Sequence, residues 1–350
     1  MYSKREELEK FRMFNGPLID VRSPSEYYKG NMPNSLNIPL FDNEERSIVG
    51  TVYKNYGREK AVIQGLDFLA DKIDNMVNKL FEALNVYKSK KVGSQIEEPT
   101  LKIYCARGGM RSQSISWLLE KYNQRNVTLR DGYKSYRKWA VESFNQEWRI
   151  NLIGGKTGTG KTKLLKLLDE NNYQIIDLEG LACHRGSTFG GIGMKEQPSN
   201  EQFENNIAEK LKSFKKNNKI FVEAESANIG RCKIPHEFFS QMKSAERIEI
   251  KKSESNRLDE LIKTYSIYEE KDLIEAVLRI KKRLGPQRTK MAIESIKNED
   301  WRAVCKSVLE YYDKCYEYEK TGKNNIKILD MTDIFDDQKT LKLIKEFAKS

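Results

Sequence analysis

The chain contains the stretch Tyr104-Cys105-Ala106-Arg107-Gly108-Gly109-Met110-Arg111-Ser112. Its residue types predict the end of a buried strand, a tight glycine-rich loop and the start of a helix. A cysteine opens the loop, an arginine closes it, and Arg107 lies between them. Loop amides and a helix N-terminus stabilise the thiolate form of a cysteine, and an arginine can hold an oxyanion with two hydrogen bonds. The stretch therefore predicts that Cys105 is a thiolate nucleophile and that Arg111 closes the loop around an anion.

The alternative for Cys105 is a structural cysteine buried at a strand end. The paired glycines and the flanking arginines argue against it, because packing alone needs neither. A nucleophile of this kind could attack a sulfane sulfur, a selenium donor or a phosphoryl group. The other cysteines have no comparable surroundings. We interpret Cys305 and Cys315 as structural residues on helix faces, and the pair Cys183-His184 as weak evidence for chemistry.

Around this loop, residues 1–145 alternate short strands with helices. Strands are predicted at residues 17–22, 36–39, 101–104 and 127–129, and helices from residue 23, at 61–87 (one long helix or two shorter ones), at 112–122 and at 132–142, with a loop at 88–100. Strands joined by crossover helices indicate a largely parallel sheet, which binds ligands at the carboxyl ends of its strands. The sequence therefore predicts a small α/β domain with Cys105 at such a strand end.

A second stretch, Gly155-Lys156-Thr157-Gly158-Thr159-Gly160-Lys161-Thr162, matches the phosphate-binding pattern GxxxxGK[ST]. A strand predicted at residues 148–153 precedes it and a helix predicted at 161–170 follows it, which is the context that the motif requires. The glycines let backbone N–H groups face phosphate oxygens. The residues assigned to phosphate or diphosphate are Gly155, Gly158, Gly160, Lys161 and Thr162, and the Thr162 hydroxyl is also assigned to Mg²⁺.

Residues 146–350 are predicted to form a P-loop NTPase-like α/β domain, with a helical portion at about 254–320 that is interrupted at Gly285-Pro286. Its further strands are predicted at 174–177, 220–223, 247–250 and 326–329, and a helix at 199–216. A nucleoside triphosphatase or kinase also needs a carboxylate near its metal. The candidates are Asp177, Glu179, Glu223 and Glu225. None follows the usual pattern of a hydrolytic aspartate, so a loop that only binds a diphosphate ester stays open.

Composition limits the classes of function. The chain has 350 residues, enough for two ordinary domains, and 62 basic against 51 acidic residues give a formal net charge of +11. Such a charge favours a polyanionic partner, with nucleic acid as the first candidate, although simple solubility explains it equally well. Five scattered cysteines without a CxxC pair and two histidines argue against a zinc knuckle and a disulfide framework. No apolar run reaches the roughly 18 residues of a membrane span and no signal peptide is evident, so we expect a cytoplasmic protein.

The first domain resembles a rhodanese. The matching residues are Leu18-Ile19-Asp20-Val21-Arg22, Glu26, Gly30, Pro33, Asn37-Ile38-Pro39 and the Cys105 loop. The spacing of Cys105 and Arg111 also occurs in cysteine phosphatases, but Tyr104 stands where those proteins have histidine, and no general-acid aspartate follows in the loop. The resemblance implies a rhodanese-like fold that carries sulfur.

The whole chain resembles the tRNA 2-selenouridine synthase family, in which a rhodanese domain is followed by a P-loop domain. Besides the Cys105 loop, the matching segments are Arg130-Asp131-Gly132-Tyr133-Lys134-Ser135-Tyr136-Arg137, Asp177-Leu178-Glu179-Gly180-Leu181-Ala182-Cys183-His184-Arg185-Gly186-Ser187, Gly190-Gly191-Ile192-Gly193 and Glu223-Ala224-Glu225-Ser226. Ala106 stands where that family has tryptophan, and Cys183 where it has asparagine. Neither difference removes a chemically essential group.

This resemblance implies a two-step modification of tRNA. The wobble 2-thiouridine of the anticodon is geranylated on sulfur by geranyl diphosphate, and the S-geranyl group is then replaced by selenium from selenophosphate. The P-loop would hold the diphosphate, the Cys105 loop would handle the selenium donor, and a selenophosphate-producing enzyme would be a partner. Expected contacts to tRNA or substrate are His184, Arg185, Tyr133, Tyr136, Arg137, Lys281, Lys282 and Arg283. A domain interface is an equal alternative for the tyrosines, and a solvated helix end for the last three residues.

Two other classes of function stay open on the sequence. One is an NTP-dependent sulfurtransferase or kinase acting on RNA, with the rhodanese-like domain as sulfur carrier; NTP hydrolysis stimulated by substrate would favour it. The other is a nucleic-acid-binding or regulatory module with degenerate sites. The intact Cys-x5-Arg loop and the intact P-loop argue against the second class, because a decayed enzyme would be expected to have lost one of them.

Overall fold

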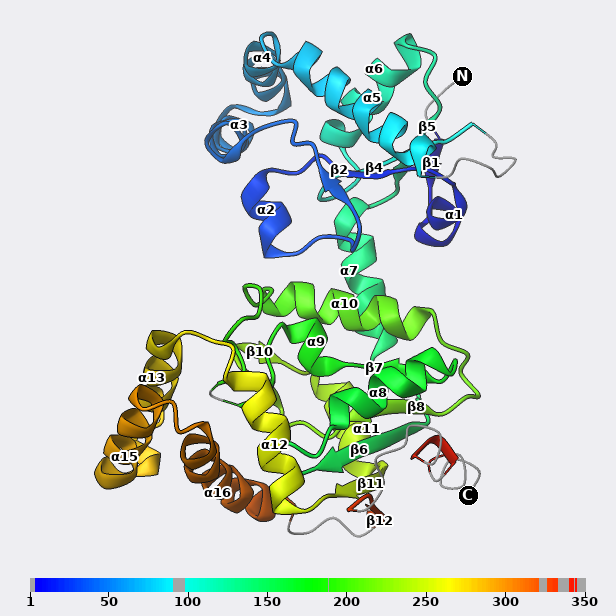
Figure 1. Cartoon of the computed structure of the whole chain (residues 1–350). Helices are drawn as coiled ribbons and strands as arrows, with labels where there is room; N and C mark the ends of the chain where they lie inside the picture. The colour runs from blue at the N-terminus through cyan, green and yellow to red at the C-terminus, as the bar shows by residue number, and fades with distance from the viewer. Residues whose placement is uncertain are drawn as a thin grey trace. The chain divides into compact units, whose positions relative to one another are not determined.

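The computed structural model describes residues 4–90, 98–187, 189–320, 326–332, 340–342 and 344; the side chains of residues 308, 315 and 317–320 lie outside this description. The chain divides into two compact units, Met1–Glu142 and Ser143–Ser350. Each unit is built on a parallel sheet with helices around it (Figure 1). The prediction of α/β architecture with parallel sheets is therefore confirmed.

The first unit contains a five-stranded sheet in the order β1-β5-β4-β2-β3, with every neighbouring pair parallel. The strands are β1 (Lys4–Glu6), β2 (Leu18–Asp20), β3 (Leu36–Asn37), β4 (Leu101–Tyr104) and β5 (Asn126–Leu129). The helices are α1 (Leu8–Met13), α2 (Pro24–Lys29), α3 (Asn43–Tyr56), α4 (Arg58–Leu69), α5 (Ile73–Ser89), α6 (Met110–Lys121) and α7 (Gly132–Ser143). Apolar side chains of α5 and α6 pack against those of β2 and β4, so these two helices cover one face of the sheet.

Helix α3 is the main element of the first unit that the sequence did not predict. None of its residues is buried, so it lacks the apolar stripe that marks a core-facing helix. The segment 61–87, for which one or two helices were expected, forms two, α4 and α5, with a break at residues 70–72. The short elements β1 and α1 were also missed.

The second unit has a five-stranded parallel sheet in the order β12-β11-β6-β8-β7 and a small antiparallel hairpin. The sheet strands are β6 (Ile150–Gly155), β7 (Gln174–Ile176), β8 (Ile220–Glu223), β11 (Glu246–Lys251) and β12 (Ile326–Asp330), and the hairpin strands are β9 (Asn228–Ile229) and β10 (Cys232–Lys233). The helices of this part are α8 (Lys161–Glu170), α9 (Leu178–Ala182), α10 (Asn200–Lys212) and α11 (His236–Ser244). The leucines of α8 pack on the sheet through Leu164, Leu165 and Leu168.

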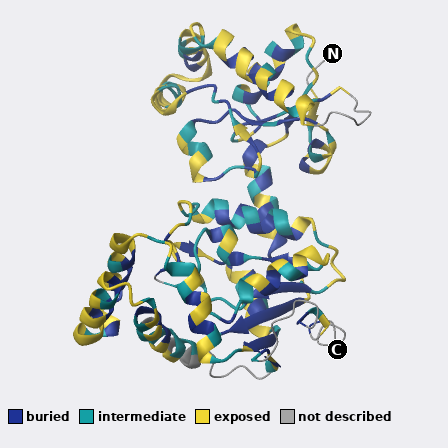
Figure 2. Cartoon of the chain, in the orientation of Figure 1, coloured by how far each residue is buried: buried dark blue, intermediate teal, exposed yellow. Residues whose placement is uncertain are grey.

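The helical portion predicted near the C-terminus is present and consists of five helices between residues 254 and 320. They are α12 (Glu254–Tyr265), α13 (Glu270–Arg279), α14 (Lys281–Leu284), α15 (Pro286–Lys297) and α16 (Trp301–Lys320). Leu273, Val277 and Ile296 of this portion form a core together with Phe189 and Ile192. The buried residues of the portion lie on the inner sides of its helices (Figure 2). The predicted break occurs where Gly285 adopts a φ of +87° and Pro286 begins α15.

Both loops singled out in the sequence follow the central strand of their sheet. Cys105 comes directly after β4, and the phosphate-binding pattern begins at the last residue of β6. Loops at the carboxyl ends of parallel strands are the usual ligand sites of such sheets. Among the described helices, none combines the length and the apolarity needed to cross a membrane.

Candidate functional site

The turn that begins α7 packs against the Cys105 loop and forms hydrogen bonds with it. The N–H groups of Tyr133 and Lys134 donate hydrogen bonds to the carbonyl oxygens of Cys105 and Ala106, at 2.8 and 3.0 Å. Gly132 has a φ of +55°, and a Cβ at this position would lie 2.1 Å from the Cys105 carbonyl oxygen. Only glycine therefore allows the two turns to pack this closely.

The sulfur of Cys105 is buried within its own loop. Its Sγ atom lies 3.2 Å from the Ser112 hydroxyl and 3.9 Å from the Gly109 carbonyl oxygen. In the part of the chain that the structure describes, the N–H groups of residues 106–109 donate no hydrogen bond to protein. The N–H groups of this loop are thus available to hydrogen-bond an anionic ligand.

Arg111 is held by Glu26 of α2. Its Nη1 and Nη2 atoms lie 2.5 and 3.1 Å from the two carboxylate oxygens of Glu26, which also accepts a hydrogen bond from the Ser23 N–H. Burial raises the pKa of the Glu26 carboxyl group, but the hydrogen bonds and charge of Arg111 outweigh this and lower the pKa to about 2. The sequence matched Glu26 to a family pattern but did not assign it this function. Arg107 is exposed at the loop surface.

Tyr133 and Tyr136, for which the sequence left contact with RNA and a domain interface open as alternatives, both have their rings buried in the first unit. They are 7% and 0% exposed, and they stack on each other with centroids 5.8 Å apart. The guanidinium of Arg22 lies 3.8 Å from the centroid of the Tyr133 ring. The two tyrosines therefore help to hold the Cys105 loop in position. Arg137, on the same helix, is half-buried.

The phosphate-binding pattern connects β6 to α8. Gly158 and Gly160 have φ values of +79° and +85°, in the left-handed region that favours glycine. The Nζ atom of Lys161 lies over the loop and donates to the carbonyl oxygen of Gly155 at 3.0 Å. The Gly155 N–H donates to the hydroxyl of Tyr316 at 2.6 Å. The loop therefore has the backbone form that the motif predicts, with its lysine above it.

Glu223 is the carboxylate that the structure places at the phosphate loop. The Thr162 hydroxyl donates to Glu223 at 3.0 Å and lies 3.4 Å from Glu179. Burial and, second, the charge of Glu179 raise the pKa of Glu223 to about 8. Burial and, second, the charge of Glu225 raise the pKa of Glu179 to about 7. Asp177 instead accepts the Gly180 N–H at 2.7 Å as the N-cap of α9.

The oxygen atoms of Thr162 and Glu223 suit a magnesium ion whose other ligands come from the substrate and water. Within the described residues, no cluster of three His, Cys, Asp or Glu side chains could hold a metal by itself. Mg²⁺ prefers oxygen ligands and is usually held by one or two carboxylates together with substrate phosphates and water. The Thr162 hydroxyl and the buried Glu223 carboxylate supply such oxygens beside the loop.

Three residues that the sequence did not single out anchor the phosphate loop from the C-terminal helices. Arg257 of α12 donates from Nε to the Thr157 carbonyl oxygen at 2.8 Å and from Nη1 to Asp313 of α16 at 2.9 Å. Lys156 lies 3.5 Å from the same carboxylate. Tyr316 of α16, besides accepting the Gly155 N–H, donates to Glu249 at 2.7 Å. No local pattern marks these residues, because their partners lie far away in the sequence.

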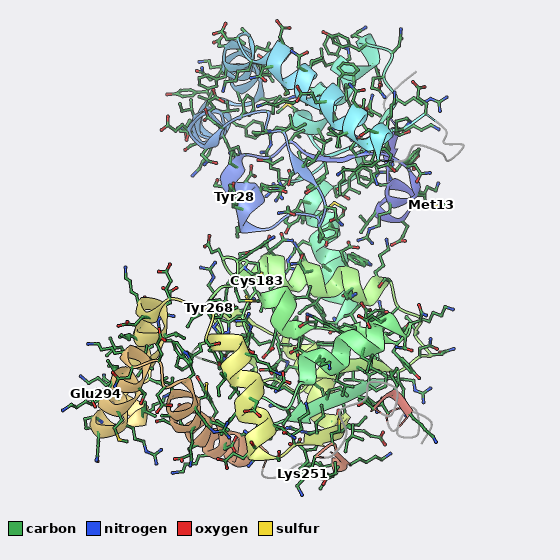
Figure 3. The ribbon with its side chains drawn as sticks, viewed as in Figure 1. Met13, Tyr28, Cys183, Lys251, Tyr268 and Glu294 are labelled. Carbon is green, nitrogen blue, oxygen red and sulfur yellow. The ribbon has the colours of Figure 1, made fainter. Side chains whose placement is uncertain are left out.

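The segment His184-Arg185-Gly186-Ser187 lies beside the carboxylates of the phosphate site. A Cβ on Gly186 would be 2.7 Å from a Glu225 oxygen and 3.1 Å from a Glu179 oxygen. Arg185 donates to the Ile192 carbonyl oxygen at 2.9 Å and to the hydroxyl of Tyr268 at 3.1 Å. Tyr268, which follows α12, is labelled in Figure 3. Burial lowers the pKa of His184, and the charge of Arg279 lowers it further. The segment is near the site, and its contact with substrate stays a prediction.

The remaining predicted contacts lie on α14, and Cys305 lines a small apolar pocket together with Thr157 and Ser187. Lys281, Lys282 and Arg283 are exposed on α14. Cys183 ends α9 with a left-handed φ of +50°, and burial raises the pKa of Cys305 to about 11. The side chain of Cys315 lies outside the described residues.

Comparison with known proteins gives matches along most of the chain. A family model described as the tRNA 2-selenouridine synthase AAA domain matches residues 148–336. A tRNA 2-selenouridine synthase of Nitrosomonas eutropha is 35% identical over 75% of this chain and 66% of its own, so the match spans just under two thirds of that relative. A tRNA 2-selenouridine synthase of Shewanella sediminis is 32% identical over 88% of this chain and 89% of its own. A solved N-terminal domain from Clostridium difficile 630 is 34% identical, covers 39% of this chain and 98% of its own, and has a TM-score of 0.35.

Proposed function

The chain belongs to the tRNA 2-selenouridine synthase family, and from this membership we propose that it is a transferase that converts wobble 2-thiouridine of tRNA to 2-selenouridine. The observation that carries the proposal is the match to this family together with an intact loop at the end of each central strand. The reaction proceeds through an S-geranyl intermediate. The substrates are geranyl diphosphate and selenophosphate.

The phosphate loop serves the first step. The sulfur of 2-thiouridine attacks the first carbon of the geranyl chain, a C–S bond forms, the C–O bond to diphosphate breaks, and the N3 proton of the base is released to water. The loop amides and Lys161 hold the diphosphate and stabilise the charge that develops on it as it leaves. Thr162 and Glu223 would hold Mg²⁺, which supplies further positive charge to the diphosphate when bound.

The first unit serves the second step, as a rhodanese-like domain with Cys105 at its centre. The selenium of selenophosphate attacks C2 of the S-geranylated base and geranylthiol leaves, after which water cleaves the P–Se bond and releases phosphate. The unpaired N–H groups of residues 106–109 bind the phosphoryl end of the donor. Cys105 contacts the selenium donor in this loop, and Arg107 adds positive charge at its surface. A selenophosphate-producing enzyme supplies the donor.

Two variants separate the steps. The measurement is mass spectrometry of the wobble nucleoside after the purified full chain acts on 2-thiouridine tRNA with geranyl diphosphate and selenophosphate. Cys105→Ala should lower selenouridine formation by about 100-fold and let the S-geranyl nucleoside accumulate, whereas Lys161→Ala should lower geranylation by about 100-fold. Selenouridine at the wild-type rate in Cys105→Ala, or undiminished geranylation in Lys161→Ala, would contradict the assigned roles.

One observation favours a second candidate, an NTP-dependent sulfurtransferase or kinase acting on RNA. The carboxylate of Glu223 lies at the end of β8 and 3.0 Å from the Thr162 hydroxyl, which is the arrangement that binds Mg²⁺–NTP in P-loop enzymes. Here the phosphate loop would hydrolyse NTP and Cys105 would carry sulfur. Substrate-stimulated release of phosphate from NTP, without geranylation, would select this candidate.

A further inference from the structure

We propose that the apolar cavity beside Cys105 binds the geranyl chain of the S-geranylated wobble base and so selects this intermediate for selenium transfer. The inference rests on the proposed function and adds a substrate subsite to the first unit. Three features of the unit carry it: the cavity, the uncovered apolar face of α4, and the charge around the opening.

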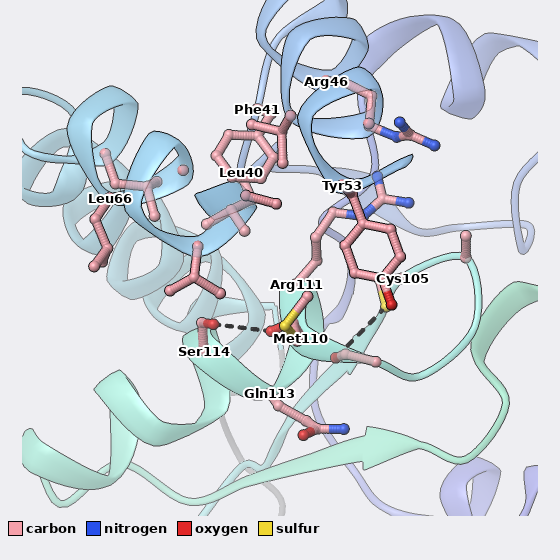
Figure 4. A pocket seen from close by; sticks show the side chains of 18 of the residues that line it. Leu40, Phe41, Arg46, Tyr53, Leu66, Cys105, Met110, Arg111, Gln113 and Ser114 are labelled. Atoms are coloured by element: carbon pink, nitrogen blue, oxygen red, sulfur yellow. Dashed lines mark hydrogen bonds between the residues drawn. The ribbon is translucent and has the colours of Figure 1, made fainter. Parts of the chain in front are cut away.

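The cavity has a volume of about 1360 Å³ and lies between the Cys105 loop, α3, α4 and α6 (Figure 4). Ligand sites usually have volumes of roughly 300–1,000 Å³, so this space can hold an apolar chain together with a nucleobase. Its apolar wall includes Leu40, Phe41, Val49, Leu66, Leu69 and Met76. Cys105 belongs to the same lining, so a chain in the cavity would lie next to the sulfur.

Helix α4 packs Phe68 and Leu69 against the core and leaves other apolar side chains exposed at this cavity. Leu66 is 60% exposed and Val62 is 39% exposed, and Tyr53 of the neighbouring α3 is 52% exposed. Exposed apolar groups gathered around one hollow favour an apolar ligand. Gly65 also faces inward, where a Cβ would lie 3.1 Å from the Phe41 ring, so the absence of a side chain there leaves the space open.

The charged residues around the cavity identify the kind of ligand. Basic residues in its lining are Arg46, Lys54, Arg58, Arg107 and Arg111, and Glu26 is the one carboxylate among the described lining residues. A ligand that fits both the apolar wall and the basic residues of the lining has an anionic portion and an apolar tail. A nucleotide that carries a geranyl chain on its base has this character, whereas 2-thiouridine itself has no tail to fill the space.

The subsite explains how the two steps follow one another. Selenium replaces a whole S-geranyl group, so the sulfur bonded to the chain must lie at the reacting centre. If the chain occupies the cavity beside Cys105, the carbon that selenium attacks is held near the loop that binds the donor. Geranylthiol, the leaving product, then departs from an apolar site.

Binding of RNA tests this subsite without requiring turnover. The probe is an anticodon stem-loop RNA with S-geranyl-2-thiouridine, compared with the same RNA carrying 2-thiouridine, and dissociation constants are measured by fluorescence anisotropy on the full chain. The variant is Leu66→Glu, and its control is Ile63→Glu, since both side chains are about 60% exposed on α4 but only Leu66 lines the cavity. The wild type and Ile63→Glu should prefer the geranylated RNA by about tenfold or more, and Leu66→Glu should lose most of this preference.

Equal preference in the two variants, or no preference for the geranylated RNA in the wild type, would overturn the subsite. The rates of the two reactions distinguish this result from a failure of the proposed function. If geranylated RNA is preferred but gives no selenouridine, the proposed function fails and the subsite stands. If selenouridine forms at equal rates in both variants and the preference is absent, the function stands and the subsite fails.

Discussion

The carboxylate of Glu26 joins three parts of the first unit. It accepts the Ser23 N–H at the start of α2, pairs with Arg111 of α6, and lies 3.7 Å from Arg46 of α3. An arginine that is expected to close an anion site must first be held in position, and a partner with a depressed pKa stays ionised at any physiological pH. The pair therefore fixes the guanidinium beside the loop before a ligand arrives.

The Glu26–Arg111 pair should make stability depend on pH in the acid range. Folding lowers the pKa of Glu26 from 4.5 to about 2, so the ionised carboxylate stabilises the folded chain above pH 4.5, and this contribution is lost as the pH falls toward 2. Glu26→Gln should lower the free energy of unfolding at pH 7 by about 1–2 kcal/mol, allowing for solvent screening. Urea unfolding of the full chain at several pH values measures the difference, which should shrink below pH 4.5.

The control for this measurement is Glu44→Gln. Glu44 is exposed on α3, and its replacement should change the free energy of unfolding by less than about 0.5 kcal/mol. A Glu26→Gln penalty that is the same at pH 7 and at pH 3 would show that the ion pair is not its origin.

At the scale of elements, α12 and α16 act as supports of the phosphate loop. Arg257 joins the loop carbonyl of Thr157 to Asp313, and Tyr316 receives the N–H of Gly155. These contacts come from a helical portion outside the sheet of the second unit. Diphosphate binding should therefore be sensitive to a pair of helices that carries none of the motif residues.

Replacing Asp313 tests this support. The side chain of Arg257 is 6% exposed, so Asp313→Asn leaves a buried charge without its ionic partner and should lower the free energy of unfolding by about 3–5 kcal/mol. It should also weaken binding of inorganic diphosphate, since Thr157 and Lys156 lose a common anchor. Chemical denaturation and isothermal titration with diphosphate measure the two effects.

A matched control joins the same two helices at the surface. Asp259 of α12 and Arg302 of α16 form an ion pair at 3.1 Å with side chains 51% and 57% exposed. Asp259→Asn should lower the free energy of unfolding by less than about 1 kcal/mol and leave diphosphate binding unchanged. Equal effects of the two substitutions would mean that helix pairing in general, and not the buried Arg257–Asp313 contact, positions the loop.

For the whole molecule, the net charge of +11 predicts a polyanionic partner without saying where it binds. Lys281, Lys282 and Arg283 are exposed together on α14 and form one candidate surface for a phosphate backbone. Neighbouring basic residues are paired with carboxylates, Arg288 with Glu310 and Lys290 with Glu294.

If this surface binds tRNA, replacing its three basic residues by glutamine should weaken binding and reduce the slope of log affinity against log salt by about 2 in magnitude. The comparison variant replaces Lys212, the last residue of α10, and Lys215 and Lys216 just beyond it, all of them exposed. This replacement changes the net charge by the same amount. Affinities for tRNA, measured at several salt concentrations, distinguish the α14 variant from the comparison variant. Equal losses in both variants would assign the effect to overall charge.

Much of the architecture followed from local pattern. The strand–loop–helix around Lys161 was confirmed because its glycines, its lysine and the flanking apolar residues are adjacent in the chain, and α8 spans the predicted residues 161–170. The parallel sheets followed from the alternation of strands and helices, and the break at Gly285 from its glycine–proline pair. Burial of Tyr133 and Tyr136 was not predictable, because an aromatic residue beside lysines suits a core and an RNA surface equally well.

The sequence by itself determined that the chain has a cysteine–arginine loop and a phosphate loop, because each of these is a run of adjacent residues whose backbone geometry depends on its own glycines. Only the tertiary structure decided which groups surround them: Glu26 beside Arg111, Glu223 beside Thr162, and an apolar cavity beside Cys105. The physical reason is that burial, charge pairing and cavity shape arise between residues tens of positions apart. Their proximity depends on the order of strands in the sheet and on the packing of α3 and α4, which no single stretch of sequence encodes.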